Sequence, residues 1–193
     1  MRPKIFLTFV LVFLIACSPQ SGREVSPLLN VDSLLTAQVN ALTEFNATLN
    51  KVVSYNGKQD STIFTPNKSE WAGELEFLRE LDIVNKPVYR DRYAVTTTKD
   101  AKSNLTVRGI AAQGDVPLRS LNLFYYKTPA NLKRVEAGFH LTKVLYTQGQ
   151  EIRIELREIG GKAVITGWSL YGTQKVILID TSRYSAECHI VLP

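Results

Sequence analysis

The spacing of apolar residues changes at Val88, and the spacing that follows constrains the fold more than any other feature. From Val88 to the C-terminus apolar and polar residues alternate, which is typical of β-strands with one face toward a core. The connections between these segments are short, so neighbouring strands must be antiparallel, since a parallel pair needs a crossover of roughly a dozen residues or more. The sequence therefore predicts an antiparallel meander. Its eight expected strands cover residues 88–98, 105–112, 118–127, 132–146, 151–159, 162–171, 174–180 and 184–192.

Two helices are expected before this sheet. Residues 31–53 carry apolar side chains at helical spacing, and Asn56-Gly57 would end that helix. Residues 57–66 are expected to form a polar connection. A second helix is expected over residues 67–84, and it ends before Pro87 because the residue preceding a proline avoids the helical region.

Several predicted strands are apolar on both sides, which decides the expected fold class. In one of them Leu123 and Tyr125 point away from Phe124 and Tyr126. A sheet with two partly apolar faces needs cover on the second face, and the two helices are the available cover. We therefore expect one α+β domain over residues 31–193. In it, two N-terminal helices pack on a strongly curved antiparallel sheet that resembles a half-barrel.

The N-terminal segment has the composition of a signal peptide. Arg2 and Lys4 precede an apolar run over residues 5–16. As a helix, this run would be ~18 Å long at ~1.5 Å per residue, short of the ~30 Å of a hydrocarbon core. The pattern therefore favours a cleaved signal peptide over a transmembrane span.

The run ends in Leu14-Ile15-Ala16-Cys17, which resembles the lipobox of bacterial lipoproteins. The resemblance implies that the Cys17 thiol accepts a diacylglyceryl group and that cleavage falls between Ala16 and Cys17. The new amino terminus would then be acylated by palmitate or a similar chain, and residues 18–30 would tether the domain to a membrane. In enteric-type sorting, a residue other than Asp after the cysteine goes with the outer membrane, and Ser18 stands there. The alternative is a cysteine packed at the end of an apolar helix.

Cleavage before Cys17 and acylation of its thiol would change the net charge of the chain and leave one free cysteine. The first 16 residues carry two of the 23 basic residues and none of the 18 acidic ones, so the mature chain has 21 basic residues and a net charge of +3. Together with the extracytoplasmic location, this small charge argues against a nucleic-acid partner. Cys188 is left without a partner for a disulfide, and we expect a buried, unreactive thiol.

No catalytic, metal or cofactor motif stands out in the sequence. The two histidines, His140 and His189, lie far apart, so a shared metal site is not expected. Arg90-Asp91-Arg92 would form strand ion pairs more readily than an anion clamp. The paired carboxylates of an acid–base catalyst are also lacking: Glu155 and Glu158 would not face one another. An aromatic ligand cavity stays open as an alternative, with its candidates at Tyr125, Tyr126, Tyr146, Tyr171 and Tyr184.

Two short segments of the mature domain are similar to uncharacterised bacterial lipoproteins of this length. They are Trp71-Ala72-Gly73-Glu74-Leu75 and Gly172-Thr173-Gln174-Lys175. The expected plan of helices and sheet also resembles the half-barrel of outer-membrane lipoprotein receptors, in architecture alone. We therefore expect a non-catalytic binding or envelope-assembly lipoprotein, held to the membrane through Cys17, whose partner is an envelope protein or an apolar small ligand. The alternatives are a carrier or receptor for lipid or another apolar ligand held between sheet and helices, and a hydrolase without a recognisable motif.

Overall fold

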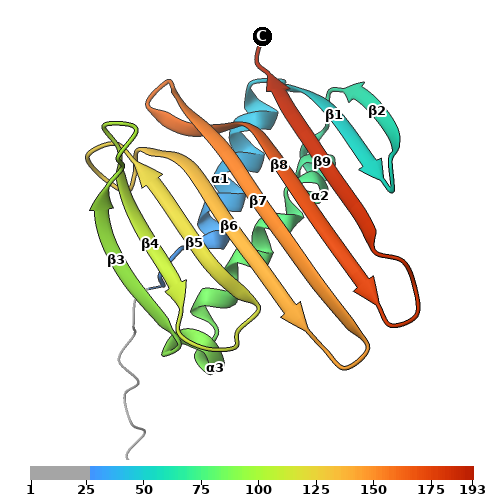
Figure 1. Ribbon diagram of the computed structural model, residues 1–193. Helices are drawn as coiled ribbons and strands as arrows, with labels where there is room; N and C mark the ends of the chain where they lie inside the picture. The colour runs from blue at the N-terminus through green and yellow to red at the C-terminus, as the bar shows by residue number, and fades with distance from the viewer. Residues whose placement is uncertain (1–26) are drawn as a thin grey trace, which may run out of the picture.

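The structure is a computed structural model, and it describes residues 27–193. The predicted signal peptide, its cleavage site and Cys17 lie outside the described residues. The described chain is an α+β domain in which helices cover one face of a nine-stranded antiparallel sheet (Figure 1). Its elements are α1 (Val31–Glu44), β1 (Thr48–Tyr55), β2 (Lys58–Phe64), α2 (Lys68–Glu74), the 3-10 helix η1 (Glu76–Asn85), α3 (Pro87–Arg90), β3 (Tyr93–Lys99), β4 (Thr106–Ala112), β5 (Leu118–Tyr125), β6 (Leu132–Thr142), β7 (Tyr146–Ile159), β8 (Lys162–Val176) and β9 (Ser182–Val191).

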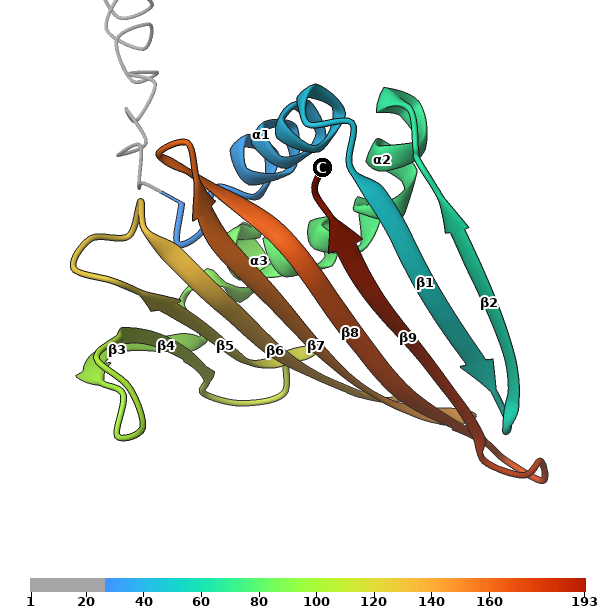
Figure 2. The ribbon, with the colours of Figure 1, turned by 90° about the horizontal axis from the view of Figure 1, so that it is seen from above.

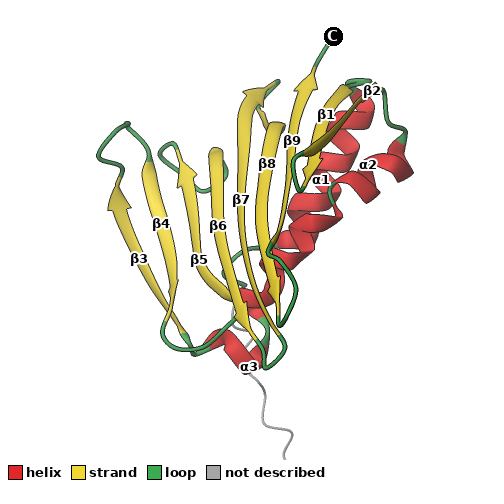
Figure 3. Cartoon of the chain, turned by 45° about the vertical axis from the view of Figure 1, so that its right-hand side comes forward, coloured by secondary structure: helices red, strands yellow, loops and turns green. Residues whose placement is uncertain are grey.

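The strand order is β2-β1-β9-β8-β7-β6-β5-β4-β3, and every neighbouring pair is antiparallel. Strands β3 to β9 form the predicted meander. The β1–β2 hairpin joins it at the other edge, where Thr48 pairs with Val191. The sheet is open, with β2 and β3 as its two edges (Figure 3).

The expected half-barrel curvature is wrong, because the sheet is neither closed nor strongly curled. The expected curvature was inferred from apolar residues on both faces of the sheet. Phe124 shows why such residues do not require a curled sheet. Phe124 lies on the face away from the helices, yet it is only 7% exposed. The guanidinium of Arg134 covers its ring, with 3.8 Å between the guanidinium carbon and the ring centroid. A long basic side chain thus supplies the cover that a curled sheet was expected to provide.

The first helix is shorter than predicted. It begins after Asn30, whose side chain accepts a hydrogen bond from the Ser33 N–H, and it ends at Glu44. Asn46 follows with φ of 48°, the left-handed conformation that commonly stops a helix. The remaining residues of the predicted helix form β1, since the β-branched Val52 and Val53 favour a strand.

The predicted polar connection over residues 57–66 is also wrong, because most of it is the edge strand β2. Asn56 and Gly57 both have positive φ, 49° and 83°, as the two-residue turn of a hairpin requires. Six of the seven residues of β2 are exposed, so this edge strand carries no apolar alternation that its sequence could display.

The second predicted helix is confirmed in position but divided in form. Asn67 caps α2, and Glu70 bonds back to the Asn67 N–H in a capping box. The chain continues as η1 and then as α3, which begins at Pro87. The first meander strand therefore starts at Tyr93 rather than at Val88.

The last part of the meander has one strand fewer than predicted. β8 continues without a break to Val176, so residues 174–180 are its end and the following turn. Likewise β6 ends at Thr142 and β7 begins at Tyr146, so Gly149 lies within a strand. Seven strands follow α3, and the β1–β2 hairpin brings the sheet to nine.

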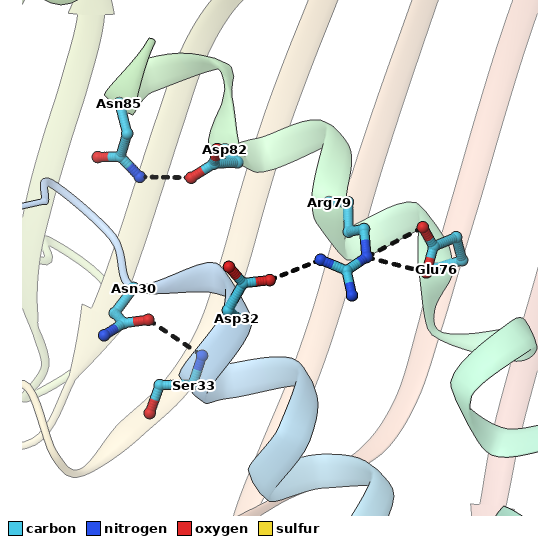
Figure 4. Close-up of polar contacts among 7 residues, drawn as sticks. All are labelled: Asn30, Asp32, Ser33, Glu76, Arg79, Asp82 and Asn85. Carbon is cyan, nitrogen blue, oxygen red and sulfur yellow. Dashed lines mark hydrogen bonds and ion pairs between the residues drawn. The ribbon is translucent and has the colours of Figure 1, made fainter. Parts of the chain in front are cut away.

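Polar contacts join α1 to η1 and hold the helical layer together (Figure 4). Arg79 of η1 pairs with Asp32 of α1 and with Glu76 of its own helix. Asn85 donates to Asp82 and to the carbonyl of Leu29, which precedes α1. These surface pairs are individually weak, and apolar packing beneath them carries most of the stability.

The core lies between this helical layer and the sheet (Figure 2). Its largest fully buried side chains include Trp71, Leu75 and Leu78 from the helices and Ile152 and Ile154 from β7. Cys188 of β9 is buried and free, as expected. Within residues 27–193, no helix has the length and apolar character needed to cross a membrane.

Candidate functional site

No helix of residues 27–193 lies over the face of the sheet that points away from α1 and η1, and we call it the open face (Figure 2). The strand register shows which residues share it. Gly138, Glu151, Tyr171 and Ser185 lie side by side on β6, β7, β8 and β9. Their neighbours along each strand point toward the helices, because successive side chains alternate between faces.

The open face is hollowed beside the loops that join β6 to β7 and β8 to β9. This hollow has a volume of ≈ 680 Å³. Gly138 and Gly149 contribute no side chain to it. A Cβ added to Gly138 would come within 3.0 Å of the Ser120 hydroxyl, and one added to Gly149 would lie 3.5 Å from Thr173 Oγ1. Glycine at these two positions therefore deepens the hollow.

Charged and aromatic side chains surround these glycines. Arg119, Arg183 and His140 provide basic groups, and Glu151 provides a carboxylate. Arg119 is already paired with Asp115 at 2.6 Å and donates to the carbonyl of Gly114. The hollow therefore offers polar contacts of both signs rather than a site for one kind of ion.

Two further hollows adjoin the first on the open face, with volumes of ≈ 320 and ≈ 740 Å³. Tyr171 lines all three. Its hydroxyl donates to Glu187 on the neighbouring strand, and this bond raises the pKa of the phenol. Tyr171 is 47% exposed, so its ring stands at the centre of the open face with one edge in water.

A row of ion pairs crosses the open face beside Tyr171. Arg153 contacts Glu136 at 3.7 Å and Glu155 at 2.7 Å, and Arg134 contacts Glu136 at 3.0 Å. These charges thus pair along and across strands on one face. Four charges held in a network restrict one another more than isolated surface pairs do.

The two histidines, for which no shared metal site is expected from the sequence, lie on separate strands. Both histidines lie on the open face, but β7 and β8 separate His140 on β6 from His189 on β9. Three strand spacings of ~4.8 Å alone place the two strands ~14 Å apart. In the described part of the chain, no group of three or more His, Cys, Asp and Glu is arranged to hold a metal ion.

The other predicted candidates are scattered. Arg90 ends the short helix α3, so Arg90-Asp91-Arg92 is not the strand segment expected from sequence. Tyr125 is buried, whereas Tyr126 is exposed and its ring centroid lies 5.2 Å from the Lys127 ammonium. Tyr171 and Tyr184 belong to opposite faces, because Tyr171 pairs with Ser185. Both border the first hollow, but Tyr125, Tyr126 and Tyr146 do not, so the five tyrosines do not line one cavity together.

The two weak sequence motifs have structural roles. Trp71 and Leu75 are fully buried core residues, and Glu74 forms a half-buried ion pair with Lys51 of β1 at 2.7 Å. Gly172 lies beneath the ring of Tyr184, where a Cβ would overlap the phenol. Packing against these neighbours accounts for both motifs without a ligand.

Sequence reasoning missed a chain of hydrogen bonds on the helix side of the sheet. Gln148 donates to the Tyr184 hydroxyl at 3.2 Å, Tyr184 donates to Gln150 at 3.1 Å, and Gln150 donates to Glu80 of η1 at 3.0 Å. Burial raises the pKa of the Glu80 carboxyl, and the bond from Gln150 partly offsets that rise. The glutamines occupy alternate positions of β7, just where its buried apolar run begins, and that spacing was the available sequence signal.

Comparison of the chain with protein-family models, with curated proteins and with solved structures gives no match.

Proposed function

We propose that the protein is a lipid-anchored lipoprotein of the bacterial cell envelope that binds another envelope protein through its open face. One observation carries the binding role. The helices cover one face of the sheet, and the other face presents three adjoining hollows that share Tyr171. Glycines, fixed ion pairs and a half-exposed tyrosine make this a shaped polar surface with an aromatic centre, as protein interfaces often have.

The membrane anchor is the second part of the proposal, and it rests on the sequence. The lipobox at Leu14-Ile15-Ala16-Cys17 supports acylation of Cys17 and delivery to the outer membrane. Growth of the cells with labelled palmitate is expected to label the chain, and Cys17→Ala is expected to abolish the label. Retained label in Cys17→Ala would refute the anchor.

The carrier alternative placed an apolar ligand between sheet and helices. In residues 27–193 buried side chains occupy that interface, and hollows of ≈ 680 and ≈ 740 Å³ lie on the opposite face. These observations favour a partner on the open face over a ligand inside the domain.

Photo-crosslinking in the living cell tests the binding role. A photoreactive amino acid replaces Tyr171 in one strain and Thr36, which is exposed on α1, in a matched control strain. We expect a discrete crosslinked protein from position 171 and none from position 36. The absence of an adduct from position 171, or the same adduct from both positions, would contradict binding through the open face.

A further inference from the structure

Two hairpin loops at the lower end of the molecule in Figure 1 expose a cluster of large apolar side chains. The β6–β7 loop contributes Val144 and Leu145, which are 90% and 65% exposed. The β8–β9 loop contributes Ile177, Leu178 and Ile179, which are 54%, 100% and 63% exposed. We call these five residues the tip patch. Scattered apolar residues are normal on a surface, but a contiguous group of this kind marks a site of interaction.

The two loops form one unit. The Ile177 N–H donates to the carbonyl of Leu145 at 3.0 Å, which ties the β8–β9 loop to the β6–β7 loop. Leu178 has φ of 64°, in the left-handed region that turns usually assign to Gly, Asn or Asp. A fully exposed leucine therefore occupies a position that its backbone disfavours. Neither local conformation nor packing within the described chain accounts for it.

Basic residues border the tip patch. Residues 143–145 and 175–183 contain three basic residues, Lys143, Lys175 and Arg183, and one acidic residue, Asp180. All four are exposed. An apolar centre with a basic border is complementary to a bilayer that contains anionic lipids, because the apolar residues match the acyl region and the cations match the headgroups.

The predicted tether enters the domain at the same end of the molecule. The Leu28 N–H donates to the side chain of Asn85 at 2.7 Å, and Asn85 lies just before α3. Figures 1 and 3 show α3 at the end where the β6–β7 and β8–β9 loops lie. Cys17 precedes Pro27 by ten residues, which span at most ~35 Å. An acyl chain on Cys17 and the tip patch can therefore reach one membrane surface.

We propose that the tip patch inserts into the membrane that holds the acyl anchor, with Lys143, Lys175 and Arg183 on anionic headgroups. This inference rests on the anchor of the proposed function. Side chains of this kind enter the boundary between headgroups and acyl chains by ~5–10 Å. Two points of attachment, the acyl chains and the tip patch, then fix the orientation of the domain and leave the open face accessible to a partner.

Depth-dependent fluorescence quenching of the acylated full-length protein tests this inference. The protein is reconstituted in vesicles of phosphatidylethanolamine and phosphatidylglycerol, and a polarity-sensitive fluorophore is attached to Leu178→Cys. The matched control carries the fluorophore at Ile63→Cys, because Ile63 is 69% exposed but lies on β2, away from the tip patch. We expect a blue-shifted emission and severalfold stronger quenching by lipids brominated on their acyl chains at position 178 than at position 63.

Each other outcome overturns the inference. Equal quenching at the two positions means that the tip patch stays in water. If the fluorophore at position 178 is shielded from water only when envelope proteins are added, the tip patch binds a protein partner. If its shielding increases with the density of this protein on the vesicles, the tip patch binds a second copy of the chain. Failure of the anchor is recognised separately, since a chain without acyl groups does not take up labelled palmitate. A second variant, Leu178→Asp with the fluorophore at Val144→Cys, is expected to lose the quenching while the protein stays on the vesicles.

Discussion

The ring of Tyr184 lies over Gly172, in the space that a side chain at position 172 would fill. This contact seats the Tyr184 hydroxyl between Gln148 and Gln150, and Gln150 in turn reaches Glu80. A glycine on β8 thus allows a polar connection between the sheet and η1. The sequence motif at Gly172 therefore has a packing role that can be tested by adding one methyl group.

We expect Gly172→Ala to destabilise the fold by about 1–3 kcal/mol, as overpacking usually does. The new Cβ would push the ring of Tyr184 aside and break its hydrogen bonds to both glutamines. Chemical denaturation measures the change in the free energy of unfolding. The matched control is Gly149→Ala, whose Cβ would meet only Thr173 Oγ1 at 3.5 Å and is expected to cost little. If Gly172→Ala costs the same in a Tyr184→Ala background, the overlap is not its cause.

A second prediction concerns Gln38, a buried polar residue of α1 that is 3% exposed. Its amide donates to the carbonyl of Ala163 at 2.8 Å and accepts from the Ile165 N–H at 2.7 Å. Strand β9 pairs with β8 only from Gly167 onward, so the side chain of Gln38 takes the place of a neighbouring strand. Gln38→Ala leaves the buried Ile165 N–H and the partly buried Ala163 carbonyl unpaired, and an unpaired buried group costs about 1–3 kcal/mol.

Thermal or chemical denaturation of Gln38→Ala measures this loss. Asn40→Ala is the control, because Asn40 is exposed on the same helix and a surface substitution usually changes stability by no more than about 0.5 kcal/mol. A Gln38→Ala variant as stable as Asn40→Ala would show that water replaces the amide without cost.

The sequence predicts the meander well because each strand carries its own alternation and each turn its own residues. It misassigns residues 48–55 because Leu49, Val52 and Val53 also continue the helical spacing of α1. Asn56-Gly57, interpreted as a helix end, is equally the strongest signature of a hairpin. The apolar spacing of the sequence does not predict β2, because an exposed edge strand needs no apolar residues. The pairing of β1 with β9, and of β2 with β1, selects the strands.

The candidate site is less accessible to sequence reasoning, because it depends on register. Gly138, Glu151, Tyr171 and Ser185 are distant in the chain, and only the pairing of β6, β7, β8 and β9 makes them neighbours. A tyrosine in an alternating strand is otherwise equally compatible with a core position. Which face the helices leave open is likewise a property of the assembled layers.

A third prediction concerns the pH dependence that Glu80 imparts. Burial raises the folded-state pKa of Glu80 above the unfolded value of about 4.3, so the folded state binds more protons. The contribution of Glu80 to stability is therefore fully present below the unfolded pKa and is lost as the pH rises through the folded pKa. Glu80→Gln keeps an oxygen that accepts from Gln150 and removes the ionisation. We expect this variant to be at least as stable as the parent at pH 7.

Denaturation of Glu80→Gln and the parent across the acid range measures the effect as a flatter pH profile for the variant. Glu151→Gln is the control, since Glu151 is exposed on the open face. A variant that is less stable than the parent at pH 7 would indicate that the charge of Glu80 stabilises the fold.

The last prediction concerns Cys188, which is 1% exposed on β9 beside Lys51. Burial raises the pKa of its thiol to about 12, although the nearby Lys51 ammonium opposes the rise. Because the thiolate is the reactive form, a shift from about 8.5 to about 12 leaves roughly three thousandfold less of it at neutral pH. In a Cys17→Ala variant, where Cys188 is the sole thiol, we expect iodoacetamide at pH 8 to modify the protein no faster than it unfolds. The raised pKa also means that the protonated Cys188 thiol stabilises the folded state. This stabilisation decreases as the pH rises from about 8.5, where the unfolded thiol ionises, toward about 12. Prompt modification of the folded protein, at the rate found in denaturant, would mean that β9 opens locally and exposes the thiol to solvent.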